Sequence, residues 1–314
     1  METTAVVFEQ PGHLRLSQVA LNPPGDEDCI VEVEWSGIST GTERLLWTGR
    51  MPAFPGMGYP LVPGYESVGR VVEAGDGCPV SVGERVFVPG SRGFAGVRGL
   101  FGGAAARVVV PGTRVVPVGD ALAEDGVLLA LAATACHALH IEPGGDMPDL
   151  IVGHGVLGRL VARLALLMGE APPTVWETNP GRRVGGEGYP VIDPADDPRN
   201  DYRLICDVSG DTSQIDGLIA RLAPRGTLLL AGFYEQPLSF AFPPAFMREA
   251  RLQVAAEWTS ADLTEVIGLV RNGRLSLAGL ITHRRDATQA ANAYQTAFED
   301  SDCLKMVLEW GGVA

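Results

Sequence analysis

The sequence has few cysteines and little positive charge. Its five cysteines stand far apart, and no two form a C-x-x-C pair. A disulfide framework or a zinc ribbon needs paired cysteines, so we expect neither, and we expect a reducing, cytoplasmic compartment. The 24 basic residues against 38 acidic ones give a net charge of −14. Such a surface repels phosphate groups, so we expect no nucleic-acid partner and no electrostatic docking on anionic lipid.

Long hydrophobic runs are also missing. No segment reaches the roughly 18 uncharged apolar residues of a membrane span, and the run 127–139 predicts a buried helix instead. The first ten residues lack a basic stretch followed by an apolar core, so we expect no signal peptide. The chain is 314 residues long and 46% hydrophobic. It is therefore long enough for two domains with separate cores.

The first 118 residues contain short valine-rich segments separated by glycine and proline. This pattern predicts a compact β domain. The expected strands are residues 5–8, 14–18, 30–36, 67–73, 85–88 and 106–110. The proline-rich stretch 51–63 predicts an ordered loop.

Beyond residue 148, expected strands and helices alternate. The order is strand 150–152, helix 156–168, strand 174–177, strand 202–208, helix 213–222 and strand 227–231. Further helices are expected around 263–270 and 286–298, and a last strand at 303–309. Strand–helix alternation predicts an α/β fold with a doubly wound parallel sheet.

A G-x-G-x-x-G motif stands between the strand 150–152 and the helix that follows it. It comprises Gly153, His154, Gly155, Val156, Leu157 and Gly158. The first glycine permits a tight turn, the second lets the backbone approach a pyrophosphate, and the third lets helix and strand pack closely. The helix N-terminus then offers free N–H groups to the phosphates. The motif therefore predicts a dinucleotide site.

The second strand of this unit ends in an acid, Glu177. A carboxylate there accepts hydrogen bonds from the adenosine ribose and repels a 2′-phosphate, which favours NAD over NADP. Arg182 and Arg183 follow shortly and could instead favour the 2′-phosphate. A solvated loop is the alternative interpretation of these arginines.

The order of the two expected domains, with a short return to the first, resembles the medium-chain dehydrogenase/reductase superfamily. The segment G-Y-E-S-V-G at 64–69 is similar to its G-H-E-x-x-G signature. G-E-R-V at 83–86 and G-G-A at 102–104 are similar to its G-D-R-V and G-G-x-A segments. The resemblance implies a GroES-like catalytic domain over 1–147, completed by 280–314, and a Rossmann NAD-binding domain over 148–279.

Zinc-dependent members of this superfamily offer Cys, His and Cys or an acid to a catalytic metal. The matching positions here are Ser39, Tyr65 and Ala130, which are not zinc ligands of the ordinary kind. The four-cysteine structural zinc lobe is also missing. The resemblance is therefore to a zinc-free branch, and we expect no bound metal.

A longer resemblance extends over essentially the whole chain. It is carried by W-S-G-I-S-T-G-T-E-R-L-L-W-T-G-R at 35–50 and its continuation to 67, and by R-G-L-F-G-G-A-A at 98–105. D-L-I-V-G-H-G-V-L-G-R-L at 149–160 agrees. These segments resemble the bacteriochlorophyllide a dehydrogenase family of bacteriochlorophyll biosynthesis. The resemblance implies that NAD accepts hydride from the 3-(1-hydroxyethyl) group of a bacteriochlorin, which becomes an acetyl group.

Oxidation of a secondary alcohol also releases a proton, which a side chain must take or relay in the absence of zinc. The candidates at the expected metal positions are Ser39, Thr40, Thr42, Glu43, Tyr65 and Glu66. Tyr65 would need a pKa well below 10 to act as a base, and Glu66 could act through water or form a structural ion pair. His137, three residues before His140, is a further candidate base or ligand to a chlorin magnesium. An ordinary histidine pair is the alternative.

Aromatic and methionine side chains gather in the segments that face the nicotinamide in the family fold. Aromatic rings stack on extended π systems, and methionine adapts to irregular shapes. The expected pigment contacts are Trp47, Met51, Phe54, Met57, Tyr59 and Phe101, with Arg44 for a propionate. Core packing is the alternative for these residues.

Two other functions stay open on the sequence alone. One is a zinc-free, NADPH-dependent quinone or enoyl reductase, and the other is a non-catalytic pigment- or nucleotide-binding protein. An expected edge strand at 252–256 could pair two copies in a homodimer.

Overall fold

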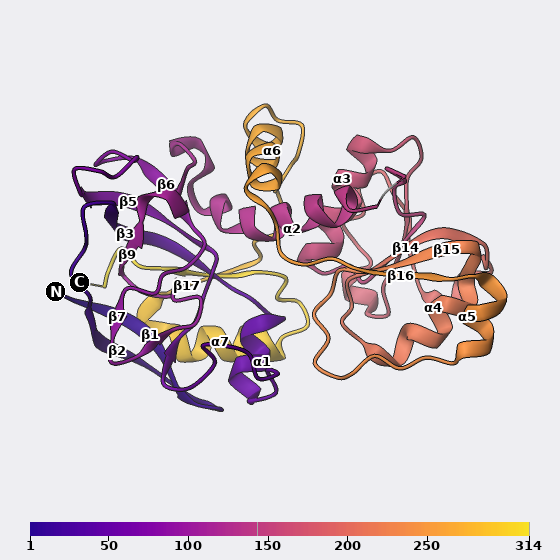
Figure 1. The fold of residues 1–314 in the computed structure, drawn as a ribbon, viewed down its shortest axis with the longest axis horizontal. Helices are drawn as coiled ribbons and strands as arrows, with labels where there is room; N and C mark the ends of the chain where they lie inside the picture. Colours follow the sequence, from indigo (N-terminus) through magenta and orange to yellow (C-terminus); the bar gives the residue numbers. More distant parts are fainter. Residues whose placement is uncertain (143, 314) are drawn as a thin grey trace. The chain divides into compact units, whose positions relative to one another are not determined.

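The computed structural model describes residues 1–142 and 144–313. Its internal contacts form two compact units: unit 1 is Met1–Ala130 with Leu280–Ala314, and unit 2 is Leu131–Gly279 (Figure 1). The boundary falls inside helix α2 (Leu129–His140), earlier than residue 147, where the sequence indicated it. Most of α2 belongs to unit 2 because its histidines hydrogen-bond to Asp262 of that unit.

Unit 1 contains two sheets built from the valine-rich segments. One sheet has the order β7-β2-β1-β4-β8, and the other has β10-β6-β5-β3-β18-β17 with β9 beside β3. The strands are β1 (Glu2–Gln10), β2 (His13–Leu21), β3 (Asp28–Ile38), β4 (Leu61–Val62), β5 (Ser67–Ala74), β6 (Arg85–Val88), β7 (Phe94–Ala95), β8 (Arg98–Gly99), β9 (Arg107–Pro111), β10 (Val116–Pro117), β17 (His283–Asp286) and β18 (Met306–Glu309). Its helices are α1 (Thr42–Thr48) and α7 (Ala290–Glu299).

The C-terminal segment completes unit 1. Strand β18 pairs antiparallel with β3, with Met306 opposite Ile38. This pairing places Lys305, just before β18, beside the end of β3, where the chain enters α1. Segments more than 200 residues apart in the sequence therefore meet behind Ser39.

Unit 2 is a parallel sheet with helices. The strand order is β13-β12-β11-β14-β15-β16, and every pair is parallel. The strands are β11 (Leu150–Val152), β12 (Thr174–Trp176), β13 (Val191–Ile192), β14 (Tyr202–Asp207), β15 (Leu222–Leu230) and β16 (Arg251–Val254). The helices are α3 (Val156–Met168), α4 (Ile215–Arg221), α5 (Phe242–Arg248) and α6 (Ser260–Arg271). In order along the chain this is 3-2-1-4-5-6, the doubly wound order that places a ligand crevice where the strand order reverses, between β11 and β14.

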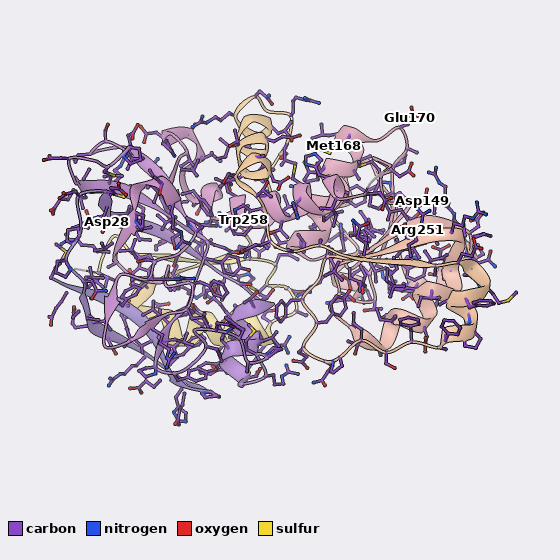
Figure 2. All side chains as sticks on the ribbon, in the orientation of Figure 1. Asp28, Asp149, Met168, Glu170, Arg251 and Trp258 are labelled. Atoms are coloured by element: carbon purple, nitrogen blue, oxygen red, sulfur yellow. The ribbon has the colours of Figure 1, made fainter. Side chains whose placement is uncertain are left out.

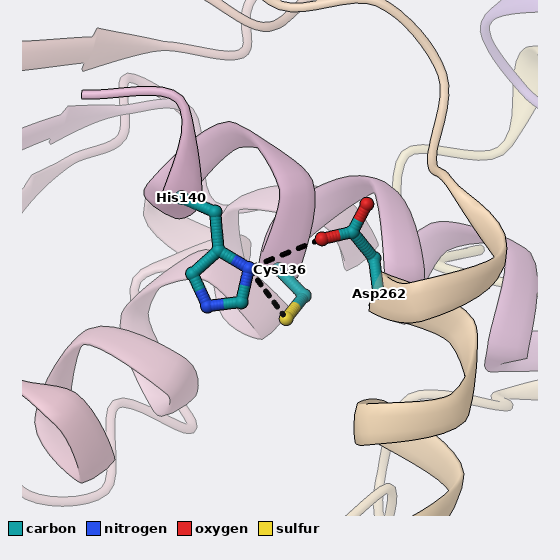
Figure 3. Close-up of side chains that lie close together, drawn as sticks. All are labelled: Cys136, His140 and Asp262. Atoms are coloured by element: carbon teal, nitrogen blue, oxygen red, sulfur yellow. Dashed lines mark hydrogen bonds and ion pairs between the residues drawn. The ribbon is translucent and has the colours of Figure 1, made fainter. Parts of the chain in front are cut away.

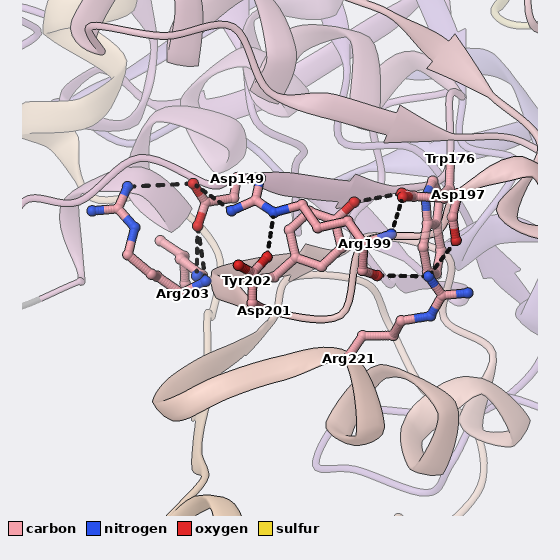
Figure 4. Close-up of polar contacts among 9 residues, drawn as sticks. Asp149, Trp176, Asp197, Arg199, Asp201, Tyr202, Arg203 and Arg221 are labelled. Atoms are coloured by element: carbon pink, nitrogen blue, oxygen red, sulfur yellow. Dashed lines mark hydrogen bonds and ion pairs between the residues drawn. The ribbon is translucent and has the colours of Figure 1, made fainter.

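A polar network ties the strands of unit 2 together (Figure 4). Asp149, just before β11 (Figure 2), accepts hydrogen bonds from the backbone and the guanidinium of Arg203 at 2.8 and 3.3 Å. Asp197 accepts from the Trp176 indole at 2.7 Å and from the Tyr202 hydroxyl. Asp149 anchors the amino end of β11 and leaves the carboxyl end for the glycine motif.

The sequence predicted most of these elements but missed the short strands β4, β7, β8, β10, β13 and β17 and two short helices, α1 and α5. Both have only seven residues, too few for a clear 3.6-residue period. The helical stretch Asp120–His140 is long and apolar enough to cross a bilayer by length and composition, although it contains three acidic residues. However, 67% of its most apolar window is buried inside the protein, which is typical of a core helix.

Candidate active site

The glycine motif forms an open turn between β11 and α3. Gly153 has φ +105°, a conformation that favours glycine. A Cβ on Gly158 would lie 1.9 Å from the Gly153 carbonyl oxygen, so this position requires glycine for close packing. A Cβ on Gly155 would meet nothing within 4 Å. The backbone of Gly155 therefore borders space at the N-terminus of α3, as a pyrophosphate would require.

His154 lies inside this motif, but its side chain is buried. Its Nδ1 lies 2.6 Å from the Arg182 carbonyl oxygen and its Nε2 lies 3.0 Å from the Tyr189 hydroxyl. Nδ1 must carry the proton to donate to the carbonyl, so Nε2 accepts from Tyr189. Burial lowers the pKa of His154 to about 4. The ring is therefore neutral and holds the loop that contains Arg182 and Tyr189. Only the backbone of His154 remains to border a cofactor.

Arg159 on α3 holds the same loop and was not identified from the sequence. Its buried guanidinium donates to the His154 carbonyl oxygen at 3.1 Å and to those of Arg182 and Val184 at 3.2 and 2.8 Å. A cationic side chain under a loop thus satisfies three carbonyl groups. No local pattern signals this role, because an arginine within a helix ordinarily faces solvent.

Glu177 follows β12 and points its carboxylate toward the glycine motif. Its Oε2 accepts from the His154 backbone N–H at 3.1 Å, and Oε1 accepts from the Asn179 N–H at 2.8 Å. Each carboxylate oxygen can accept further hydrogen bonds. The acid is thus held beside the motif with acceptor capacity left for ribose hydroxyls.

The two arginines after Glu177 occupy different surroundings. The Arg183 guanidinium donates to the carbonyl oxygens of Glu177 and Thr178 at 2.8 and 2.9 Å and forms an ion pair with Asp193. These contacts hold Arg183 within its own loop. The Arg182 carbonyl oxygen accepts from both His154 and Arg159.

Three hydroxyl residues meet in unit 1 at the positions that correspond to zinc ligands or lie next to them. The hydroxyls of Tyr65 and Ser39 are 2.9 Å apart, and Ser39 Oγ also accepts from the Thr42 N–H at 3.3 Å. Thr42 hydrogen-bonds to Tyr65 as well. We call Ser39, Thr42 and Tyr65 the hydroxyl cluster. It can donate to and accept from a substrate oxygen.

Tyr65 does not have the lowered pKa that a tyrosine base would need. Burial raises the pKa of Tyr65 well above 10, and the charge of Glu66 adds to the rise, while hydrogen bonds from Ser39 and Thr42 oppose it. A phenol of this kind stays protonated at neutral pH. Tyr65 is therefore suited to donate or relay a hydrogen bond, and it is not a stored base.

Glu43 lies fully buried behind the hydroxyl cluster. Its Oε1 accepts from the Ser39 N–H at 3.0 Å, and its Oε2 accepts from the Tyr294 hydroxyl at 2.6 Å. Burial raises the pKa of Glu43 to about 7, helped by the charge of Glu66 and opposed by these hydrogen bonds and by Lys305. Glu43 can thus change its charge near neutral pH.

Glu66 forms a buried ion pair, one of the two roles that the sequence left open. Its Oε2 lies 2.6 Å from Lys305 Nζ. Its Oε1 is buried and has no hydrogen-bond partner in the part of the chain that the structure describes. Lys305 was not identified from the sequence, although it is the only lysine in the chain.

His137 and His140 lie on one face of α2 and share the carboxylate of Asp262; the contact of His140 is drawn in Figure 3. Their Nδ1 atoms lie 3.0 and 3.1 Å from the two oxygens of Asp262 on α6. Burial alone would raise the pKa of Asp262, but hydrogen bonds from Thr259 and both histidines lower it to about 2. The arrangement ties α2 to α6.

Cys136 also lies beside this tie, with Sγ 3.8 Å from His140 Nδ1. The ligand atoms of Cys136, His140 and Asp262 all lie within 4.8 Å of one another, a spacing that could suit a metal ion. However, burial raises the pKa of the Cys136 thiol to about 12, and the tie is already satisfied by hydrogen bonds. The absence of a metal site therefore stays a prediction.

The expected pigment contacts divide by burial. Met51 is buried in the core of unit 1. Trp47 packs edge-on against Phe8, with their ring centroids 5.6 Å apart. Phe54, Met57, Tyr59 and Phe101 are only partly buried against this core. Phe101 lies edge-on to Tyr65 at 5.2 Å, which brings an aromatic ring to the hydroxyl cluster. Arg44 is exposed on α1.

Comparison with known proteins now places the chain. The family model of the alcohol dehydrogenase GroES-like domain matches residues 25–120. The 2-desacetyl-2-hydroxyethyl bacteriochlorophyllide A dehydrogenase of Rhodobacter capsulatus is 56% identical over 313 residues, 99% of both chains. The protein of the same name from Cereibacter sphaeroides is 55% identical and covers 100% of both chains. The chain belongs to the bacteriochlorophyllide a dehydrogenase family.

This membership confirms the resemblance seen at 35–67, 98–105 and 149–160. The fold class is confirmed independently of close sequence similarity. The structure of 2R,3R-butanediol dehydrogenase from Bacillus subtilis superposes with a TM-score of 0.84 at 19% identity, covering 98% of this chain and 99% of that one. A bacteriochlorophyllide a dehydrogenase thus has the α/β architecture of an alcohol dehydrogenase, with hydroxyl side chains at two of the three positions that the resemblance matches to zinc ligands.

Proposed function

We propose that this protein oxidises the hydroxyethyl group of a bacteriochlorophyllide to an acetyl group, with NAD as the electron acceptor. The observation that carries the proposal is the 55–56% identity, over the full length, to two dehydrogenases named for that substituent. This similarity favours the dehydrogenase over a quinone or enoyl reductase and over a non-catalytic binding protein.

The residues of unit 2 fit a dinucleotide. When bound, NAD supplies the acceptor for the hydride of the substrate carbon. The open face of Gly155 and the N-terminus of α3 would hold the pyrophosphate, with the backbone of His154, Val156 and Leu157 completing the turn. Glu177 would accept hydrogen bonds from the adenosine ribose.

Preference for NAD over NADP is supported by the loop after β12. The carboxylate of Glu177 would repel a 2′-phosphate, and the nearby Arg183 guanidinium is already held by two carbonyl groups and Asp193. Redirecting Arg183 toward a phosphate would leave the carbonyl oxygens of Glu177 and Thr178 without that donor, at a cost of order 1–3 kcal/mol for each one left buried.

The hydroxyl cluster would bind the substrate oxygen. Tyr65, protonated at neutral pH, would hold the alcohol oxygen by a hydrogen bond. The alcohol proton would pass to Ser39 Oγ as the Ser39 hydroxyl releases its own proton to solvent, so that both hydroxyls end neutral. Thr42 would fix Ser39 through its N–H and Tyr65 through its hydroxyl. Glu66 and Glu43 lie behind the cluster and would set the electrostatic potential at Tyr65.

A second candidate for the proton acceptor is His137. Its Nδ1 is engaged by Asp262, an arrangement that orients an imidazole. The tie between α2 and α6 already accounts for this contact, so we assign the proton to the hydroxyl cluster. His137→Gln should then leave turnover within a few-fold of wild type, and loss comparable to that of Tyr65→Phe would transfer the role to His137.

The partly buried rings of Phe54, Tyr59 and Phe101, with Met57, would offer apolar contacts to a bacteriochlorin, and Arg44 would offer an exposed charge for a propionate. Met51 and Trp47 would contribute mainly from the core, because packing already covers most of Met51 and one face of Trp47.

We also propose that two copies pair through β16. This strand ends the sheet order of unit 2, and Val254 is 70% exposed. A cavity of about 690 Å³ lies beside it, lined by exposed Phe242, Phe246 and Met247 among others. An unpaired strand edge beside apolar side chains favours association with a second strand. The five cysteines are free, which supports a reducing, cytoplasmic compartment.

The decisive experiment incubates the protein with 3-(1-hydroxyethyl) bacteriochlorophyllide a and NAD while pigment and NADH absorbance are followed. The proposal predicts equimolar acetyl pigment and NADH. Gly155→Val should abolish turnover because its side chain would fill the cofactor space, whereas the matched variant Gly217→Val on α4, equally free of neighbours, should retain it. Pigment binding without oxidation, or activity confined to NADPH and a quinone, would overturn the proposal.

A further inference from the structure

The chain contains one lysine among its 24 basic residues, and that lysine is buried. Every other basic residue is arginine. Lys305 is 1% exposed, whereas lysine is almost never fully buried unless it is paired. Its position just before β18, opposite the end of β3, directs the ammonium into unit 1 behind the hydroxyl cluster.

The geometry around Lys305 suits a compact cation. Nζ donates to Glu66 Oε2 at 2.6 Å and to the Ile38 carbonyl oxygen at 3.3 Å. Gly37 also packs closely on this carboxylate, because an added Cβ there would lie 2.4 Å from Oε2. A planar, five-donor guanidinium has a different shape and different hydrogen-bond demands from an ammonium.

Two carboxyls and this one ammonium form a buried charge cluster with two tyrosines. Glu43 is faced by Tyr294 from α7, by the Ser39 N–H from the start of the β3–α1 connection, and by Glu66 and Lys305. Glu66 adjoins Tyr65 in the chain, and Tyr65 feels the charges of both Glu66 and Glu43. With both carboxyls and the ammonium charged and both tyrosines neutral, the cluster carries one net negative charge.

We propose that Lys305 is a positioning residue for the reaction: its ammonium holds Glu66 behind Tyr65 and sets the charge that the hydroxyl cluster experiences. This inference rests on the proposed function only for its effect on turnover. Lys305 touches no reacting atom in this scheme and acts through Glu66 and Glu43.

The cluster predicts pH shifts of opposite sign. The negative charge of Glu66 raises the pKa of Glu43, and the positive charge of Lys305 lowers it. If Glu43 sets the pH dependence of kcat, its apparent pKa should lie near 7 in the wild type. Lys305→Met should then move that apparent pKa upward by about one unit. Glu66→Gln should move it downward, and the double variant should return it toward the wild-type value. A lysine that only stabilises the fold would lower activity without these opposite shifts.

A second measurement does not depend on turnover. Because Lys305 is the only lysine, protein labelled with ¹³Cε-lysine gives a single side-chain resonance. We expect this resonance to shift as Glu43 titrates near pH 7, and Glu43→Gln to remove that shift. The matched control Glu265→Gln, on α6 in unit 2, should leave it unchanged.

The two readouts separate this inference from the proposed function. A protein without pigment activity but with the titration near pH 7 would refute the function and leave the charge cluster supported. Two results would overturn the role of Lys305. One is a lysine ¹³C chemical shift that does not change between pH 5 and 9. The other is a shift of the apparent pKa of kcat in the same direction for Lys305→Met and Glu66→Gln.

Discussion

Replacing Tyr65 by phenylalanine tests the hydroxyl cluster with little disturbance of packing. The change keeps the ring, which packs edge-on to Phe101 at 5.2 Å, and removes only the hydroxyl. Ser39 Oγ loses its 2.9 Å partner but keeps the Thr42 N–H. We therefore expect the variant to fold, with a loss of unfolding free energy of about 0.5–1.5 kcal/mol.

The effect on turnover should be larger. As the proton leaves the alcohol, negative charge develops on the substrate oxygen, and a hydrogen bond to a charged group contributes about 1.5–3 kcal/mol. At about 1.4 kcal/mol for each factor of ten, kcat should fall roughly 10- to 150-fold. The affinity for NAD should be unchanged, because the dinucleotide motif lies in unit 2.

The assay is steady-state oxidation of the hydroxyethyl pigment, with NAD affinity measured separately. Tyr202→Phe is a matched control, because it removes a buried tyrosine hydroxyl that donates to Asp197 within unit 2. It should lower stability without lowering kcat at temperatures where the protein is folded. If Tyr65→Phe keeps wild-type kcat and weakens only pigment binding, Tyr65 is a pocket wall and the reasoning fails.

Four further predictions concern the cofactor, metal, pH and assembly. Glu177→Ala should weaken NAD binding by roughly 1.5–3 kcal/mol while NADP binding changes less or improves; equal losses in titration calorimetry would remove Glu177 from the ribose site. Elemental analysis should find no stoichiometric zinc, and chelators should not affect activity. One zinc ion per chain, with activity lost on its removal, would contradict the proposed role of the hydroxyl cluster. Folding raises the pKa of Glu43 from 4.5 to about 7, so the folded state binds the proton more tightly. As the pH rises from 4.5 to about 7, the wild type should therefore lose about 1.4 kcal/mol of unfolding free energy per pH unit relative to Glu43→Gln. An equal pH dependence of the unfolding free energy in both proteins would refute this. Val254→Asp should convert a dimer to monomer in light scattering, and an unchanged mass would exclude pairing through β16.

The fold could be predicted from the sequence where periodicity was long. Helix α3 has the predicted bounds, because its apolar residues recur over 13 positions and Gly169 follows its end. The strand 85–88 also matches β6. Helices α1 and α5 were missed because each is only seven residues long and receives its stability from tertiary packing.

The candidate site divides in the same way. The glycine motif was visible because it needs glycine at fixed positions, for the backbone conformation of Gly153 and for the missing side chains of Gly155 and Gly158. Lys305 and Tyr294 were not, because their roles come from contacts with Glu66 and Glu43, more than 200 residues away in the sequence. The burial of His154 was equally hidden, since Arg182 and Tyr189 reach it through a loop whose course no short motif specifies.

Replacing a metal by hydroxyl groups changes what can set the pH dependence of the reaction. A bound zinc ion would lower the pKa of an alcohol directly, because its charge stabilises the alkoxide. The hydroxyl cluster is neutral, and Tyr65 stays protonated at neutral pH, so the cluster itself offers no group that titrates there. In unit 1 the nearest carboxyl with a pKa of about 7 is Glu43, which contacts Ser39 through a backbone N–H. If the proton leaves through the hydroxyl cluster, the pH profile of this enzyme should therefore follow a buried carboxyl that never touches the substrate, and Glu43→Gln should flatten that profile near pH 7.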